Sequence, residues 1–220
     1  MSKSKSKESN QSQGTISHTG ADNLRRMQET FSDCTDIVIT PWNYGPGLSY
    51  TAFSIYFESL TLGKDTTFMR QTLQDIVTDE LGTTSEVNRD VLMHYFSHRG
   101  VTTKKCEVLD DFKIAVEHVL IGHVVIFVDR WDKAISYEAT SIETRQVTEP
   151  STEPVVQGPR EGTIENLKIN LGLLRRRLMH PGFKLESIKA GGKTKTEIVF
   201  GYLDDAVNTE VLAELKRRLH

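Results

Sequence analysis

Residues Glu149–Arg177 read EPSTEPVVQGPREGTIENLKINLGLLRRR, and they combine a linker, a charged turn and a helix. Prolines and the glycines of residues 158–162 interrupt regular structure in the first half. The second half has apolar residues at helical spacing. A helix- and strand-forming segment precedes this stretch, and a strand–strand–helix pattern follows it. The sequence therefore predicts an α/β (α+β mixed) fold of two small lobes, each a mixed sheet packed with helices, joined by a Pro-rich linker.

The chain divides into four parts by composition. Residues 1–20 are rich in Lys, Ser, Gln and Asn, so we expect a disordered tail. Residues 21–145 form the first predicted α/β lobe, and residues 146–162 form the linker. Residues 163–220 form the second lobe, in the order helix, strand, strand, helix.

Apolar periodicity also locates the individual elements. We expect helices near residues 21–31, 65–76, 85–98 and 110–120, and strands near residues 37–40, 48–60, 124–128 and 133–139. In the second lobe, strands are expected at residues 183–188 and 195–203. Asn208 is expected to cap a last helix whose inward residues are Val211, Leu212, Leu215 and Leu219.

Composition excludes several classes of protein. The chain of 220 residues is 37% hydrophobic and 26% charged, with a net charge of −3, which is ordinary for a soluble globular protein and gives no indication of nucleic-acid binding. The longest apolar run, residues 119–128, is too short for a membrane helix, and the start has no signal-peptide pattern. The two cysteines, Cys34 and Cys106, are interpreted as reduced thiols.

The helix of the opening stretch has two distinct faces. Its predicted buried stripe is Ile164, Leu167, Leu171, Leu174 and Leu178. Asn166, Asn170 and Arg177 lie together on a polar face that could hydrogen-bond a neighbouring lobe or subunit. Arg175, Arg176 and Arg177 complement the helix dipole at its C-terminus, although a solvated basic end explains them equally well.

The charged turn before the helix looks like a hinge. Gly158 and Gly162 allow the chain to turn, prolines such as Pro159 stiffen it, and Glu161 suits the positive end of the helix dipole. Arg160 does not suit that position, so it is expected to pair with a carboxylate such as Glu149 or Glu153. We interpret the whole stretch as a hinge plus a docking face.

Catalytic and metal-binding patterns are weak. The segment Ala190–Thr194 resembles part of a phosphate-binding loop, but Ser187 occupies the position of a required glycine and a strand follows, so a hairpin turn is expected. His94 and His98 have metal-sharing spacing without a further ligand nearby. There is no Gly-x-Ser-x-Gly elbow. We therefore expect no catalytic residue, no metal site and no cofactor.

A set of residues in the second half resembles a known family. The ordered set comprises Arg145, Glu149-Pro150, Glu153, Val155-Val156, Gly158-Pro159-Arg160-Glu161-Gly162, Asn170, Arg175-Arg176-Arg177, Lys193-Thr194-Lys195-Thr196 and Arg218-Leu219. This set resembles the A subunit of bacterial spore germinant receptors, and the likeness covers about residues 22–220. The chain departs from the family at Thr163, where phenylalanine is frequent, and between Pro41 and Ser54.

The resemblance implies a function. The chain would be the non-enzymatic, soluble N-terminal domain of a membrane-embedded nutrient receptor subunit, acting in signal transduction and assembly during spore germination. The implied partners are a transporter-like membrane subunit, a lipoprotein subunit and further copies in the membrane, with no nucleic acid. The implied location is the spore inner membrane, with this domain on the cytoplasmic (core) side. An alternative is a ligand-binding module with a small molecule between the lobes; an enzyme is the weakest hypothesis.

Overall fold

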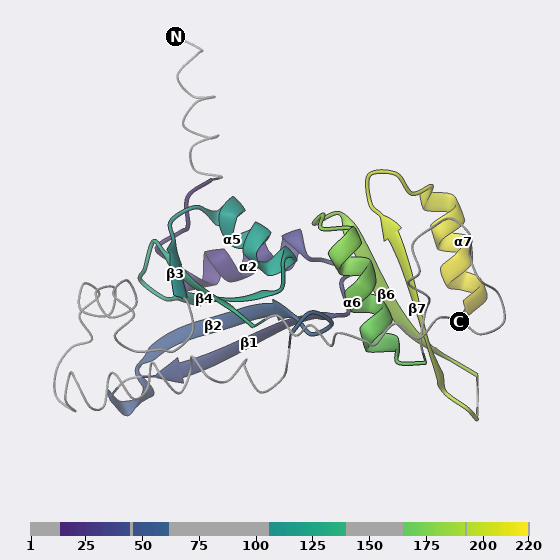
Figure 1. The fold of residues 1–220 in the computed structure, drawn as a ribbon, viewed down its shortest axis with the longest axis horizontal. Helices are drawn as coiled ribbons and strands as arrows, with labels where there is room; N and C mark the ends of the chain where they lie inside the picture. The colour runs from purple at the N-terminus through teal and green to yellow at the C-terminus, as the bar shows by residue number, and fades with distance from the viewer. Residues whose placement is uncertain (1–13, 45, 62–105, 140–164, 192, 220) are drawn as a thin grey trace, which may run out of the picture.

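The structure is a computed structural model that describes residues 14–44, 46–61, 106–139, 165–191 and 193–219. The described residues form a larger first lobe, up to residue 139, and a smaller second lobe from residue 165 (Figure 1). The expected linker at 146–162 and the expected helices near 65–76 and 85–98 lie outside the described residues.

The first lobe is built on a five-stranded sheet. Its strands are β1 (Ile37–Tyr44), β2 (Tyr50–Phe57), β3 (Cys106–Leu109), β4 (His123–Val128) and β5 (Ala134–Glu138). The spatial order is β1-β2-β4-β5-β3, and every paired neighbour is antiparallel. The short 3-10 turn η1 (Pro46–Leu48) connects β1 to β2. Strand β3 was not predicted, because a run of four residues has too little alternation to stand out.

Two helices cover one face of this sheet. Helices α2 (Gly20–Thr30) and α5 (Phe112–Leu120) lie together above the strands in Figure 1. Met27 and Phe31 from the α2 segment pack with Phe57 and Phe127 from the strands, and all four side chains are buried. The helical spacing of the apolar residues therefore predicted this core correctly. A second buried cluster, with Trp42 and Tyr44 among its members, occupies the opposite face of the sheet.

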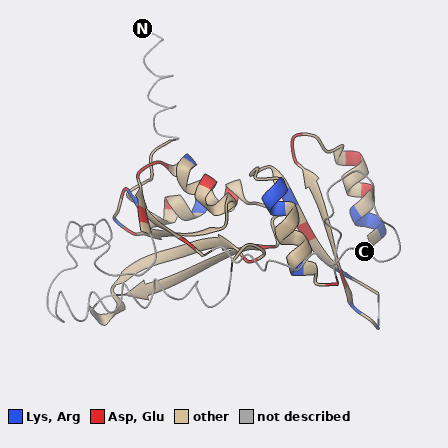
Figure 2. Cartoon of the chain, in the orientation of Figure 1, with Lys and Arg blue, Asp and Glu red and all other residues tan. Residues whose placement is uncertain are grey.

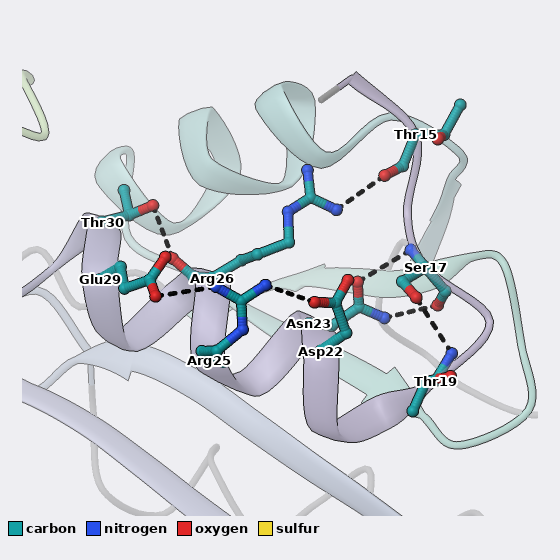
Figure 3. A network of polar contacts seen from close by, with 9 residues as sticks. All are labelled: Thr15, Ser17, Thr19, Asp22, Asn23, Arg25, Arg26, Glu29 and Thr30. Carbon is teal, nitrogen blue, oxygen red and sulfur yellow. Dashed lines mark hydrogen bonds and ion pairs between the residues drawn. The ribbon is translucent and has the colours of Figure 1, made fainter. Parts of the chain in front are cut away.

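The start of the described chain corrects an expectation. Residues 14–20 were assigned to a disordered tail, but Ile16 is 3% exposed and joins the core. Figure 3 shows why this segment is held: the amide side chain of Asn23 accepts a hydrogen bond from the Ser17 N–H at 2.9 Å and donates one to the Ser17 carbonyl at 2.7 Å. Arg26 donates to the Thr15 carbonyl at 2.8 Å. Composition did not indicate that Ile16 joins the core or that Asn23 of α2 holds the segment in place.

The second lobe has the predicted order of elements. Helix α6 (Leu167–Arg177) is followed by strands β6 (Phe183–Ala190) and β7 (Thr196–Leu203), which form a two-stranded antiparallel sheet, and then by helix α7 (Thr209–Leu219). The Asn208 side chain caps α7 by accepting hydrogen bonds from the N–H groups of Glu210 and Val211 at 2.9 and 3.2 Å. The predicted α/β (α+β) class is confirmed.

Helix α7 is attached to the small sheet by polar contacts. Lys216 lies 2.7 Å from the Glu186 carboxylate on β6, and the Tyr202 hydroxyl on β7 donates to the same oxygen. Burial raises the pKa of Glu186, but the hydrogen bonds from Lys216 and Tyr202 outweigh burial and hold this pKa below its usual range. The expected inward packing of Val211 and Leu215 is wrong, because these side chains are 65% and 40% exposed.

Candidate functional site

The two lobes are joined by a contact between the described residues, which we call the seam. The seam consists of α6, the start of β6, the turn before β1 and the turn after β2. In Figure 1, α6 stands between the first lobe and the β6–β7 sheet. Its chemistry begins with the residues that fix the ends and faces of α6.

Helix α6 begins at a side-chain cap. Asn166 has an extended backbone and its side-chain oxygen accepts from the Ile169 N–H at 3.4 Å. Asparagine at this position satisfies a backbone donor that the helix itself leaves unpaired. The predicted docking residue Asn166 is therefore also the residue that starts the helix. Thr163 and Ile164, where the helix was expected to begin, lie outside the described residues.

The predicted apolar stripe of α6 does not form its buried face. Leu167, Leu174 and Leu178 are 36%, 43% and 39% exposed. The buried positions of the helix are Gly172 and Arg175, which are three residues apart and so lie on one face. Apolar periodicity gave the wrong face because this helix is held by an ion pair and by close backbone approach.

Arg175 is the centre of the seam. Its side chain is 1% exposed, and its guanidinium donates two hydrogen bonds to the carboxylate of Asp36, from Nε at 2.9 Å and from Nη2 at 2.7 Å. The remaining terminal nitrogen, Nη1, donates to the Phe183 carbonyl at 2.6 Å. This forked arrangement uses the planar geometry of arginine, which lysine cannot reproduce. Arg175 thus binds the first lobe and β6 at the same time.

Aromatic rings enclose this ion pair. The Arg175 guanidinium carbon lies 4.2 Å from the centre of the Phe57 ring and 5.1 Å from that of Phe183. Burial lowers the pKa of the Arg175 guanidinium, but the hydrogen bonds and charge of Asp36 outweigh burial, so its pKa is raised. Both partners are charged and almost fully removed from water, since the Asp36 side chain is 6% exposed. Loss of either partner leaves the other buried without its counter-charge, which is costly.

Backbone contacts continue the seam beyond the ion pair. The Thr35 N–H donates to the Leu185 carbonyl at 2.8 Å, and the Thr35 hydroxyl donates to the same oxygen at 3.0 Å. Lys184 on β6 is 4% exposed and donates to the Thr30 carbonyl, at the end of α2, at 3.0 Å. Strand β6 is therefore joined to the first lobe along its first residues.

A glycine lets α6 approach the first lobe. A Cβ atom added at Gly172 would overlap the Ser59 carbonyl oxygen, which is a backbone atom and cannot swing away. The Ser59 hydroxyl in turn donates to the Asp36 carboxylate at 3.0 Å. The turn after β2 therefore supports both the helix and the ion pair.

A cavity opens beside the seam. Its volume is about 360 Å³, and it is lined from both lobes, by Thr35, Glu58 and Ser59 on one side and Lys168, Ser187 and Glu197 on the other. Two of the lining residues form an ion pair, with Nζ of Lys168 at 3.1 Å from Oε1 of Glu58. The lining offers hydroxyl, carboxylate and ammonium groups, which are suited to a small polar ligand.

The structure places the sequence-predicted site residues unevenly. Glu149, Glu153, Gly158, Pro159, Arg160, Glu161 and Gly162 lie outside the described residues. Asn166, Asn170, Arg175, Arg176 and Arg177 lie on α6 or at its cap, with Arg175 buried and Arg176 and Arg177 exposed. Because Arg175 is buried, it is not part of a solvated basic helix end, which was the alternative interpretation of the three arginines.

Sequence reasoning missed the partners of Arg175. Asp36 is 139 positions away in the chain, and Phe57 and Phe183 looked like ordinary strand residues. Asp36 did occupy a recognisable place, in the turn directly before β1. Nothing in the sequence distinguished it from the other carboxylates.

One serine of the described residues contacts histidines. The Ser136 hydroxyl lies 2.8 Å from Nδ1 of His118 and 3.1 Å from Nδ1 of His123. Ser136 is 1% exposed, so this hydroxyl has no route to a substrate and joins α5 to the sheet instead. Among the residues described, no three His, Cys, Asp or Glu side chains gather as a metal site would require.

Two further expectations can be compared with the described residues. Strands β6 and β7 pair as an antiparallel hairpin that ends at Ala190 and Thr196, and Gly191 after β6 has a φ of 85°, so the hairpin prediction is confirmed. Cys34 and Cys106 are both free thiols. Within the described ranges, no helix is long and apolar enough to span a bilayer.

The fold and the seam define the chain as a two-lobed α/β domain whose lobes are joined by the buried ion pair of Arg175 and Asp36. Comparison with known proteins then places the chain more narrowly. Residues 25–220 match the family model described as the Bacillus/Clostridium GerA spore germination protein, and the chain belongs to this family.

Several curated relatives are similar along most of this chain. An uncharacterized membrane protein of Bacillus subtilis strain 168, YfkQ, is 28% identical over 206 residues, which is 93% of this chain and 38% of that protein. Spore germination protein KA of the same organism is 26% identical over 204 residues, covering 93% of this chain and 36% of that protein. The chain thus spans well under half the length of either relative.

A solved structure has the same fold. It is the crystal structure of the N-terminal domain of the A subunit of the Bacillus megaterium spore germinant receptor GerK3, with a TM-score of 0.70. The two chains are 22% identical, and the match covers 93% of this chain and 72% of the other. The resemblance found in the sequence is therefore confirmed for the family and for the fold.

Proposed function

We propose that this chain is the non-enzymatic N-terminal domain of a spore germinant receptor A subunit and that it acts in signal transduction and complex assembly. The observation that supports this most strongly is the seam, because Arg175 contacts Asp36 and the Phe183 carbonyl at once. When one lobe moves, either these hydrogen bonds break or the other lobe moves with it. A domain built this way transmits movement between its two ends without chemistry of its own.

The proposed partners are the other receptor subunits, namely a transporter-like membrane subunit and a lipoprotein subunit, together with further copies of the A subunit. The proposed location is the spore inner membrane, with this domain on the core side. Among the described residues, the candidates for contact with those partners are the cap residue Asn166 and the α6 residues Asn170, Arg176 and Arg177. The segment with Arg160 and Glu161 is proposed as the hinge.

The proposal is tested in the full-length receptor. Arg175→Lys keeps the charge and loses the two-pronged contact with Asp36. We expect Arg175→Lys spores to germinate more slowly per receptor, with the amount of receptor in the spores measured by immunoblot. Arg176→Lys is the matched control, since Arg176 is exposed and adjacent in the chain. Normal germination per receptor in both variants would contradict signalling through the seam.

A second candidate function is ligand binding, because the cavity of about 360 Å³ is lined by both lobes. A small polar molecule there would contact Ser59 and Lys168 together and would resist their separation. Thermal-shift measurements with amino acids and sugars test it directly, since a ligand that binds only the folded state raises the melting temperature. No shift at high ligand concentration argues against this function, as does an equal shift in a Ser59→Ala, Lys168→Ala variant.

A further inference from the structure

The turn of the β6–β7 hairpin is a well-formed projection. The last paired residues are Ala190 and Thr196, and the Lys195 N–H donates to the Gly191 carbonyl at 3.2 Å across the turn. Gly191 and Lys195 both have a positive φ, at 85° and 46°. In the view of Figure 1 the turn reaches beyond the ends of α6 and α7. The hairpin therefore presents its turn residues at a fixed place, away from the helices.

Three exposed lysines occupy this projection: Lys189, Lys193 and Lys195. Ion pairs neutralise Lys168, Lys184 and Lys216 elsewhere in the second lobe, whereas none is found for these three among the described residues. The carboxylate of Glu197 lies opposite Lys189 in the register and accepts a hydrogen bond from Ser187 at 2.7 Å. We call Lys189, Lys193 and Lys195 together the basic tip; Figure 2 shows the blue of Lys and Arg at the turn of this hairpin.

We propose that the basic tip docks on the anionic headgroups of a phospholipid membrane and so orients the domain against the bilayer; this rests on the proposed function, which puts the domain beside a membrane. Clustered lysines are attracted to anionic lipid only within about a Debye length, roughly 8 Å at physiological salt. A projecting tip meets that condition even though the chain as a whole carries a net charge of −3.

The same features disfavour nucleic acid as the partner. Proteins that hold single strands line an extended basic groove with aromatic side chains for base stacking. Residues 189–196 read KAGGKTKT, with small residues and lysines and no aromatic side chain. A compact cluster of flexible ammonium groups fits a surface of phosphate headgroups, which demands charge but no fixed geometry.

Vesicle flotation tests the proposal. The chain is mixed with vesicles of equal parts phosphatidylglycerol and phosphatidylcholine, or of phosphatidylcholine alone, and the bound fraction is measured against lipid concentration. The variant Lys189→Gln, Lys193→Gln, Lys195→Gln is expected to bind the anionic vesicles about a hundredfold more weakly, at roughly fivefold for each lysine. Binding by the unaltered chain is expected to vanish at high salt and with neutral vesicles.

A matched variant removes the same formal charge from the first lobe: Arg25→Gln, Lys113→Gln, Arg130→Gln. All of these residues are exposed, so both variants are expected to fold, which circular dichroism verifies. The control is expected to keep most of the binding. Equal binding by the tip variant and the unaltered chain would overturn the proposal, and so would equal loss in both variants, or binding of the unaltered chain to an oligonucleotide but not to vesicles.

The two proposals fail in different assays. If neither the unaltered chain nor any variant binds vesicles, while Arg175→Lys slows germination, membrane docking by the basic tip is overturned and signalling through the seam stands. Tip-dependent vesicle binding with normal germination per receptor in Arg175→Lys would support the tip and contradict signalling through the seam.

Discussion

Replacing Arg175 by methionine is the most informative single change to the structure. Methionine keeps an unbranched apolar stem between the rings of Phe57 and Phe183, so little packing volume is lost. It removes the hydrogen bonds to the Asp36 carboxylate and to the Phe183 carbonyl. Among the described residues, Asp36, whose side chain is 6% exposed, then keeps the Ser59 hydroxyl as its one side-chain donor.

The expected magnitude follows from that burial. Removing one partner of a buried ion pair costs about 3–5 kcal/mol, because the other charge stays out of water without compensation. Set against a total unfolding free energy of about 5–15 kcal/mol, this is a large fraction. With a urea dependence of about 2–3 kcal/mol per molar, the midpoint of unfolding is expected to fall by about 1–2.5 M.

The assay is urea unfolding followed by circular dichroism, with Arg176→Met as the control. Arg176 is exposed, so its replacement is expected to change the free energy of unfolding by less than about 0.5 kcal/mol. A double-mutant cycle with Asp36→Leu then measures the pair itself. The double variant is expected to cost less than the sum of the single variants by well over 0.5 kcal/mol. A cost below about 1 kcal/mol for Arg175→Met, with no coupling to Asp36, would refute the reasoning.

Three further predictions concern other parts of the fold. Gly172→Ala is expected to destabilise the domain by about 1–3 kcal/mol, because its Cβ would overlap the Ser59 carbonyl; thermal unfolding checks this, and a stabilisation by the better helix former would contradict the close approach. Hydrogen bonds from Lys216 and Tyr202 lower the pKa of Glu186 despite burial, so the ionised carboxylate contributes fully to the free energy of unfolding above the ordinary pKa of 4.5. That contribution is lost as pH falls through the lowered pKa. The acid-unfolding profile of Glu186→Gln should lack this part of the pH dependence, and an unchanged profile would rule the contribution out. Asp111 caps α5 by accepting from the N–H groups two and three residues on, at 2.7 and 3.1 Å, so its replacement by alanine should cost about 1 kcal/mol in urea unfolding; no measurable cost would mean that the cap is dispensable.

Local pattern predicted much of the architecture. The spacing of Met27 and Phe31 identified the helix that covers the sheet, and both residues are buried. The apolar run after Gly122 identified β4, and the turn beyond it identified β5 as its antiparallel partner. These elements form for reasons that short stretches of sequence contain: one apolar face, a cap and a turn residue.

The seam could not be predicted in the same way. Arg175 lies in a run of three arginines, and sequence alone cannot distinguish a buried arginine from a solvated one. What buries it is a carboxylate 139 positions away and two rings from different strands. The need for glycine at position 172 likewise depends on the Ser59 carbonyl, which lies against it from a distant part of the chain. Long-range pairing of this kind leaves no periodic signal.

The family resemblance compensated in part for that limit. It singled out Arg175, Arg176 and Arg177 together, and the structure then separated the buried residue from its exposed neighbours. The residues from Glu149 to Gly162 that carry most of the resemblance lie outside the described part of the chain. Their role as a hinge stays a prediction.

Native-state hydrogen exchange at the Thr35 amide tests the central claim most directly. This N–H donates to the Leu185 carbonyl across the seam at 2.8 Å, so it exchanges only when the lobes separate or the domain unfolds. A clamped seam predicts that Thr35 is protected nearly as strongly as the amides of β4. It also predicts that Arg175→Met accelerates exchange at Thr35 far more than in β4. Exchange of Thr35 at the rate of an exposed amide in the unaltered chain would contradict the claim that Arg175 and Asp36 hold the lobes together.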